Sequence, residues 1–429
     1  MQKYYTTIAS LLLVMILPFA GISQTQLTTT PRASQKAATM QRIGLADITV
    51  TYHRPAAKDR EIWGKLVPYG TVWRAGANEN TTIEFSRDVK IEGKPISAGI
   101  YGLHLIPEAT KCTVIFSNNS TSWGSFTYNP AEDALRVEGR LVPTKHDYEL
   151  VTFEFEEVQR SSAVCNLKWG NKKVAFTIES EVDHDAIASL RNELRDRPGF
   201  SWQGYNEAAA YCLQNEVNLQ EGLQWATQSV FMNPNPINLR TKALLTGKIN
   251  GQGNKTEALN QSIASFTNDL NNQPCTWKEW NAAATFASQN KAYDEALAFV
   301  EKSIDMNPNM TNMMAKVNIL EAKGDEKMAM KVKKEAISKG SNAELNNYGY
   351  QLMFGGKINE AVEIFEANTE KNPKDPNAWD SLAEGYKNKG DKENAIKACK
   401  KSLSLNPQPN VKANTLNTLR SLGVDTDDM

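Results

Sequence analysis

The stretch of this sequence with the most side chains suited to binding or catalysis runs from Arg54 to Phe85. It reads RPAAKDREIWGKLVPYGTVWRAGANENTTIEF and combines guanidinium, carboxylate, amide and indole groups with three glycines. Loops of this composition commonly line a binding surface on a rigid scaffold. We therefore predict a ligand site here, completed by one tryptophan further along the chain. The candidate residues are Arg54, Arg60, Trp73, Arg74, Asn78, Glu79 and Trp123.

These residues also have structural interpretations, which stay open at this point. Trp63 and Trp123 fit a small β core, in which an indole buries a large area, whereas Trp73 fits a core and a ligand contact equally well. Glu79 fits an ion pair with Arg74 or with Arg54, which would fix a long loop.

Catalytic motifs give little support to an enzyme. The four histidines form no HxH or HExxH pair, no serine stands in a Gly-x-Ser-x-Gly elbow, and no glycine-rich phosphate loop precedes a helix. We therefore predict no metal, no cofactor and no catalytic residues. The enzymatic alternative is a hydrolase or carbohydrate-active domain that uses Trp73, Arg74 and Glu79, with Glu79 in a carboxylate pair.

Period-two alternation of apolar and polar residues dominates residues 37–181. Such alternation is typical of strands with one face on a core and one in water. Turn residues separate the strands, and no long helix is indicated. We predict an antiparallel β sandwich or barrel of about eight to ten strands. Examples of apolar alternation are Val151, Phe153 and Phe155, and Val174, Phe176 and Ile178.

The same region carries a series of short motifs. They are Tyr-His-Arg-Pro at 52–55, Gly-Lys-Leu-Val-Pro-Tyr-Gly at 64–70, Val-Trp-Arg-Ala-Gly-Ala-Asn-Glu at 72–79, Ala-Gly-Ile-Tyr at 98–101, Trp123-Gly124 and Lys168-Trp169. In this order they resemble the secreted bacterial family known as domain of unknown function 2911. The resemblance implies an all-β domain and a periplasmic or extracellular setting, and it implies no activity.

Residues 182–201 are charged and helix-prone, and we interpret them as a helical linker. From Trp202 onward the apolar period becomes 3.6, and the unit at 379–407 resembles the tetratricopeptide repeat. Laid along the chain, this unit predicts six repeats over 202–409 and a capping helix and tail over 410–429. Four of the units end at a proline, namely Pro234, Pro308, Pro373 and Pro407.

The repeat resemblance implies a concave face lined by the first helix of each pair, where partners bind. Stacked pairs share apolar stripes that one pair cannot bury alone. The alternative for each outward position is a solvated surface. The positions carried over by spacing are Tyr211, Gln214, Asn281, Thr285, Gln289, Asn346, Tyr350, Asp380, Glu384 and Asn388.

The N-terminus predicts export. Residues 1–23 combine Lys3, an apolar run over 8–20 and small residues at the end, as in a signal peptide, and 24–36 reads as a disordered leader. No second stretch predicts a membrane span. The net charge of −1 gives no reason to expect nucleic acid. Cys112 and Cys165 lie in predicted strands, and we favour buried free thiols over a disulfide.

The sequence thus predicts an exported, non-catalytic scaffold protein of the cell envelope, periplasmic or extracellular. Its helical repeats would grip a protein or peptide partner, and its β domain would bind a second ligand. The alternative is that the β domain is a hydrolase that the repeats recruit. The oligomeric state stays open.

Overall fold

The computed structural model describes residues 31–427, so the predicted signal peptide lies outside the described residues. The chain forms two compact units, one up to Ala186 and one from Ile187 onward. Separate hydrophobic clusters fill the two units, as expected for independent domains. No helix among the described residues is long and apolar enough to cross a membrane.

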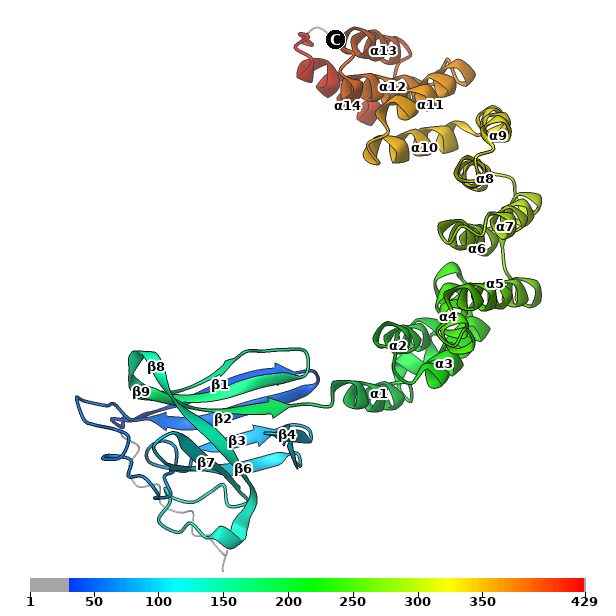
Figure 1. Cartoon of the computed structure of the whole chain (residues 1–429). Helices are drawn as coiled ribbons and strands as arrows, with labels where there is room; N and C mark the ends of the chain where they lie inside the picture. Colours follow the sequence, from blue (N-terminus) through cyan, green and yellow to red (C-terminus); the bar gives the residue numbers. More distant parts are fainter. Residues whose placement is uncertain (1–30, 428–429) are drawn as a thin grey trace, which may run out of the picture. The chain divides into compact units, whose positions relative to one another are not determined.

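Nine strands build the described part of the first unit, and all paired neighbours run antiparallel (Figure 1). Their order in the sheet is β1-β2-β3-β6-β7-β8-β9-β4-β5. The strands are β1 (Gln35–Ile43), β2 (Ala46–Arg54), β3 (Thr82–Phe85), β4 (Val89–Ile91), β5 (Lys94–Ile96), β6 (Gly99–Pro107), β7 (Lys111–Ser117), β8 (Asp133–Glu156) and β9 (Ser162–Glu179), with a 3-10 turn at Pro130–Glu132.

The sheet curls so that the end of β2 comes against β8. Just beyond β2, the Ala57 amide donates to the Glu149 carbonyl at 2.7 Å, and the Val151 amide of β8 donates to the Pro55 carbonyl at 3.1 Å. Arg54 reinforces this seam because its Nε donates to the Val151 carbonyl at 2.9 Å. The predicted antiparallel β fold is confirmed, in its barrel-like form.

Alternation along the strands follows the expected pattern. In β2, Ala46, Ile48, Val50 and Tyr52 are buried and the residues between them are partly exposed. The first strand starts at Gln35, so the last residues of the predicted disordered leader belong to the sheet.

Three indoles fill one end of this core. Trp73 stacks on Trp169 with ring centroids 5.6 Å apart and meets Trp63 edge-on at 6.0 Å. Trp63 is satisfied by its own hydrogen bond, since its Nε1 donates to the Trp169 carbonyl at 2.9 Å. Trp73 is therefore a packing residue, and of its two interpretations the core one is correct.

The five cysteines are free thiols. Cys112 lies on β7 and Cys165 on β9, both buried, and burial raises the pKa of the Cys112 thiol to about 12. Both behave as small apolar residues, as the favoured interpretation held.

The segment predicted as a linker is largely helical, with α1 at Val182–Glu193 and a 3-10 turn at Arg197–Phe200. The second half of this segment also packs against the repeat array. Ile187 is buried, and Leu190 and Leu194 pack with it against the core of the first repeat. The array is therefore covered at its start by part of the predicted linker.

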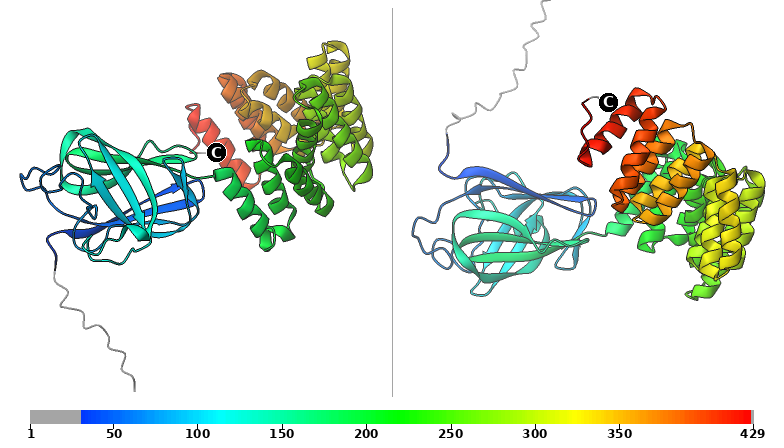
Figure 2. Two further views of the ribbon diagram at one scale, coloured as in Figure 1. Left: turned by 60° about the horizontal axis from the view of Figure 1, so that its bottom comes forward. Right: turned by 90° about the horizontal axis from the view of Figure 1, so that it is seen from above.

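Twelve helices of the described second unit form six antiparallel pairs, followed by α14 (Figure 1). Figure 2 shows the same succession of pairs from two further directions. The helices are α2 (Trp202–Asn215), α3 (Leu219–Met232), α4 (Pro236–Asn250), α5 (Lys255–Asn272), α6 (Trp277–Gln289), α7 (Tyr293–Met306), α8 (Met310–Lys323), α9 (Glu326–Lys339), α10 (Asn342–Phe354), α11 (Ile358–Lys371), α12 (Pro376–Lys389), α13 (Lys392–Ser404) and α14 (Pro409–Ser421).

One small residue recurs where the two helices of a pair cross. The hydroxyls of Ser229, Ser303 and Ser402 each donate to a carbonyl at the start of the preceding helix, at 2.7 to 2.8 Å. In two repeats a buried asparagine of the next helix, Asn238 or Asn312, donates to the same serine. A small polar residue thus permits the close crossing of two helices and accepts a hydrogen bond that links one repeat to the next.

Candidate functional site

Two long loops meet at one end of the barrel. The loop after β2 contributes residues 72–81, and the loop between β7 and β8 contributes residues 118–128. Asn80 joins them, since its backbone amide donates to the Ser122 carbonyl and its Nδ2 donates to the Asn119 carbonyl, both at 3.1 Å. Loops that span strands depend on such bonds because they have no regular ladder.

Glu79 is the centre of an ion-pair group at this end. Arg32 Nη1 lies 2.6 Å from Glu79 Oε1, and His53 Nε2 lies 3.3 Å from Oε2. Asn78, with a left-handed φ of 58°, donates to the Ser34 carbonyl at 3.1 Å. Residues 32–34 are therefore fastened to the loop, and the arginine that pairs with Glu79 is neither Arg74 nor Arg54.

The surroundings of His53 and Glu79 determine which of these two side chains is charged. Burial lowers the pKa of His53, against the opposing effect of Glu79, so the ring is neutral near pH 7. Burial also acts to raise the pKa of Glu79, but a backbone hydrogen bond, Arg32 and His53 together hold that pKa below its ordinary value. The Arg32–Glu79 pair is thus ionised on both sides.

Arg74 lies beside this group and has no anionic partner among the described residues. Its Nε is buried without a hydrogen-bond partner, and none of its guanidinium nitrogens bonds to any residue of 31–427. Its Cζ is 5.9 Å from the ring centre of Phe126. A Cβ on Gly124, whose φ is +68°, would come within 2.3 Å of Arg74 Nη1 and displace the guanidinium, and the positive φ also favours glycine there.

Two aromatic side chains stand exposed on the second loop. Trp123 is 53% exposed and Phe126 is 82% exposed. The guanidinium of Arg32 lies over the Trp123 ring at 5.3 Å from its centre. We call the residues that share this surface the loop cluster: Arg32, His53, Arg74, Asn78, Glu79, Asn80, Trp123 and Phe126.

Buried polar atoms without hydrogen bonds gather in the loop cluster. Ten such side-chain atoms occur among the described residues, and four belong to it. Buried polar groups are otherwise nearly always paired, so this concentration marks a place shaped by something other than stability. The four atoms are His53 Nδ1, Arg74 Nε, Glu79 Oε2 and Asn80 Oδ1.

The structure brings together four of the seven predicted site residues, Arg74, Asn78, Glu79 and Trp123. The other three have structural roles: Arg54 holds the seam to β8, Trp73 packs in the core, and Arg60 donates to the Ala56 and Ala57 carbonyls of its own loop. Trp123 is exposed, which corrects its interpretation as a core residue.

Sequence reasoning missed four members of the loop cluster as site residues. Asn80 lies inside the stretch at 54–85 but was not among its candidates. Arg32 lies in the predicted disordered leader, and nothing in the sequence signals its pairing with Glu79, 47 positions away. Phe126 belongs to none of the motifs identified in the sequence. His53 stands in the Tyr-His-Arg-Pro motif, which was the available signal.

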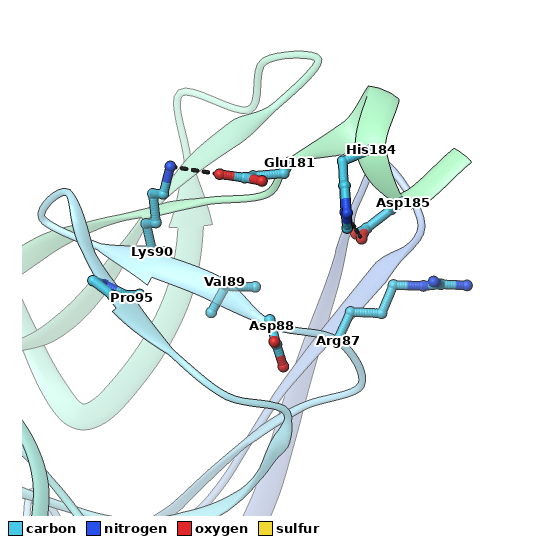
Figure 3. Close-up of a pocket in the computed structure, with 8 residues that line it drawn as sticks. All are labelled: Arg87, Asp88, Val89, Lys90, Pro95, Glu181, His184 and Asp185. Carbon is cyan, nitrogen blue, oxygen red and sulfur yellow. Dashed lines mark hydrogen bonds and ion pairs between the residues drawn. The ribbon is translucent and has the colours of Figure 1, made fainter. Parts of the chain in front are cut away.

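Two pockets of the first unit lie elsewhere. One of about 750 Å³ lies between the loop at 57–69 and the β8–β9 hairpin, and Arg60 lines it beside Asp59 and Glu61. A second of about 380 Å³ is lined by residues at 87–95 and 181–185, where Lys90 pairs with Glu181 at 2.6 Å (Figure 3).

Neither pocket supports the hydrolase alternative. Trp73, Arg74 and Glu79 line neither of these two pockets, and Glu79 is held in its ion pair with Arg32. No group of three metal-ligating side chains is arranged to hold a metal ion in residues 31–427.

A groove of about 560 Å³ lies in the array between the first helices of the first three repeats, α2, α4 and α6. Its floor is apolar, and Phe266 and Phe286 pack there with ring centres 5.2 Å apart. Gln214, Thr285 and Gln289, all predicted for the concave face, lie on its rim, beside Arg240 and Thr241. Arg240 forms no hydrogen bond or ion pair with any described residue.

The other predicted concave residues divide into three kinds. Asn281 and Asn346 each keep a buried amide oxygen without a partner. Tyr350 donates to Glu384 Oε2 at 2.9 Å, which links two repeats, and Asn388 donates to the Glu384 carbonyl at 2.8 Å.

The last two members are packing residues rather than open surface. Tyr211 is partly buried against the core of the first repeat. Asp380 is 7% exposed and accepts a hydrogen bond from Thr415 of α14. The capping helix covers Asp380, which corrects its placement on the binding face.

Fold and groove define a helical repeat array of the tetratricopeptide kind joined to an antiparallel β unit. Residues 34–178 match the family described as protein of unknown function DUF2911, and residues 376–409 match a tetratricopeptide repeat. Both resemblances stated from the sequence are thereby confirmed. Among curated proteins the comparison finds no match.

Solved structures of repeat proteins also resemble the chain. A chain of the APC/C hetero-tetramer Cut9-Hcn1 is 14% identical with a TM-score of 0.24, and the match covers 55% of this chain and 46% of that one. YrrB, described as a tetratricopeptide protein with an unusual peptide-binding site, is 19% identical with a TM-score of 0.22, covering 46% of this chain and 97% of its own.

A tetratricopeptide repeat protein from Parabacteroides merdae ATCC 43184 is 14% identical with a TM-score of 0.25, and the match covers 56% of this chain and 93% of that one. The chain spans about half the length of the APC/C protein that it matches, 46%. Identities this low concern the fold alone.

Proposed function

We propose that this chain is an exported, non-catalytic binding protein of the cell envelope. The array holds an extended segment of a protein partner in the groove of its first three repeats, and the loop cluster of the β unit binds a second ligand. The observation that carries the proposal is the groove itself, which combines an apolar floor, a rim of amides and an unpaired guanidinium.

The groove chemistry specifies the partner segment. Leu213, Leu244 and Phe286 offer apolar surface to apolar side chains. The exposed amides of Gln214 and Gln289 can donate to and accept from the main chain of an extended peptide. Arg240 lacks an anionic partner among the described residues, so an acidic side chain of the segment complements it.

Export is proposed from the apolar run of the N-terminus. It is tested by fractionating cells and sequencing the N-terminus of the mature chain. Recovery of the chain in the envelope fraction, starting near residue 24, supports the proposal, and recovery in the cytosol starting at Met1 contradicts it.

Charge reversal at the groove tests partner capture. The full tagged chain is used to capture proteins from an envelope extract, and each captured protein is quantified by mass spectrometry. Arg240→Glu places a like charge against an acidic partner, and such juxtaposition costs several kcal/mol, so capture of the partner falls by about tenfold or more.

The matched control is Lys302→Glu, the same reversal at an exposed lysine on the second helix α7. It leaves capture unchanged. Equal losses for the two variants, or no loss for Arg240→Glu, contradict the groove as the binding surface.

A further inference from the structure

The buried unpaired nitrogen of Arg74 sets it apart from the other cations of the described residues. Of the ten buried side-chain atoms without a hydrogen bond, Arg74 Nε is the one that carries a fixed positive charge. The side chain as a whole is only partly buried, and its two terminal nitrogens are not among these buried atoms. The guanidinium therefore has donors free to pair with an anionic group that arrives from outside.

The surroundings of Arg74 hold it in this position. Ala75, the next residue, is fully buried with a left-handed φ of 55°, and Thr81 donates to its carbonyl at 3.2 Å. Gly124 leaves the space that the guanidinium occupies. A left-handed backbone at Ala75 and the space left by Gly124, on two different loops, accommodate this side chain, as expected of a binding residue.

The charge count defines the anion. Arg32 and Glu79 neutralise each other, and His53 is neutral because burial lowers its pKa. Lys36 lies opposite His53 and also helps to lower its pKa, so Arg74 and Lys36 together leave a net positive charge here that an anionic group complements. The flat fork of a guanidinium suits a carboxylate.

The rest of the ligand, which carries the carboxylate, faces a flat, open surface of the protein. Trp123 and Phe126 are exposed beside Arg74, and neither of the two pockets described above for the first unit includes either ring. Exposed indole and phenyl faces suit the apolar face of a sugar ring, and an open surface suits a polymer.

We propose that the loop cluster binds an acidic saccharide, with Arg74 pairing to a uronate carboxylate and Trp123 and Phe126 stacking on the sugar rings. This inference rests on the proposal that the β unit binds a second ligand, and it names the chemical class of that ligand. It needs nothing from the groove of the array.

Titration calorimetry of the full mature chain tests the inference, with oligogalacturonate as the probe and a neutral galactose oligomer of the same length as its control. The wild type binds the acidic oligomer and not the neutral one. Arg74→Gln weakens binding by about 10- to 100-fold, the effect of losing a charge-assisted hydrogen bond. Arg140→Gln, at an exposed arginine of β8, leaves binding unchanged.

A melting experiment without ligand separates a binding role from a structural one. Because Arg74 forms no hydrogen bond or ion pair with a described residue, Arg74→Gln melts at the same temperature as the wild type or above it. A large drop in melting temperature shows that Arg74 is a structural residue and overturns the inference.

Three further outcomes overturn the saccharide assignment: no binding of oligogalacturonate, equal binding of the neutral oligomer, or binding of a polyglutamate peptide instead. Each differs from a failure of the proposed function as a whole, because capture of the protein partner is measured in the same preparations through Arg240. A chain that captures its partner and ignores the saccharide refutes this inference alone.

Discussion

Replacing Phe365 with alanine is expected to lower the free energy of unfolding of the last repeats by about 3 to 5 kcal/mol. Phe365 of α11 is fully buried and lies between two glycines of neighbouring first helices. A Cβ on Gly349 would come within 2.4 Å of its ring, and one on Gly385 within 2.9 Å. The ring fills the space that both glycines leave, so its removal opens a cavity shared by two repeats.

Denaturant unfolding followed by hydrogen exchange of residues 342–404 measures this effect. Exchange is needed because an array can lose single repeats without unfolding as a whole. The matched control is Phe354→Ala at the end of α10, where the ring is 81% exposed. Its expected change is within about 0.5 kcal/mol. Comparable losses for the two variants would contradict the packing role of Phe365.

The stability of the C-terminal end of the array is expected to fall as pH rises. Burial, opposed by the hydrogen bond from Thr415 and assisted by Glu384, raises the pKa of Asp380 from 3.8 to about 6. A protonated Asp380 can donate to Thr415 Oγ1, which then donates to the Val411 carbonyl 2.9 Å away. With an ionised Asp380, the single Thr415 hydrogen must serve two acceptors.

The sign and size of this effect follow from linkage. The folded pKa lies above the unfolded value, so the contribution to stability is fully present below pH 3.8 and is lost as pH rises through about 6. At about 1.4 kcal/mol for each pH unit between the two values, the loss is about 3 kcal/mol.

Asp380→Asn isolates this contribution. Unfolding of the variant and the wild type is compared at pH 4.5 and pH 7.5, again by hydrogen exchange in the last repeats. The variant keeps an acceptor for Thr415 and carries no charge. Its free energy of unfolding is therefore higher than that of the wild type at pH 7.5, and this difference is lost at pH 4.5. The exposed Asp305→Asn serves as control. A wild type that is the more stable of the two at pH 7.5 would rule out the buried charge.

The repeat architecture could be predicted because a few residue types determine it. Small residues such as Ala361 and Ala395 are needed where helices cross, and proline follows the second helix of a pair. These requirements recur at a fixed spacing, so one clear unit locates the others. Alternation likewise predicted the antiparallel sheet, because one face of each strand must be buried.

The candidate site was predicted only in part, because its contacts join distant segments. Glu79 pairs with Arg32, which composition assigns to a disordered leader. Asp380 has the spacing of a concave residue, yet α14 docks over it. Arg74 was chosen as a candidate because of its guanidinium group. That it lacks a carboxylate partner among the described residues is visible only in the structure.

Photo-crosslinking from within the groove tests the central claim most directly. A benzoylphenylalanine replaces Thr285 on the groove rim, or Lys302 on α7 as the control, in the full chain within its own cells. The account predicts that position 285 crosslinks to a partner segment with apolar and acidic residues, that Arg240→Glu abolishes this product, and that position 302 gives none. A partner that crosslinks from position 302 and never from position 285 would contradict it.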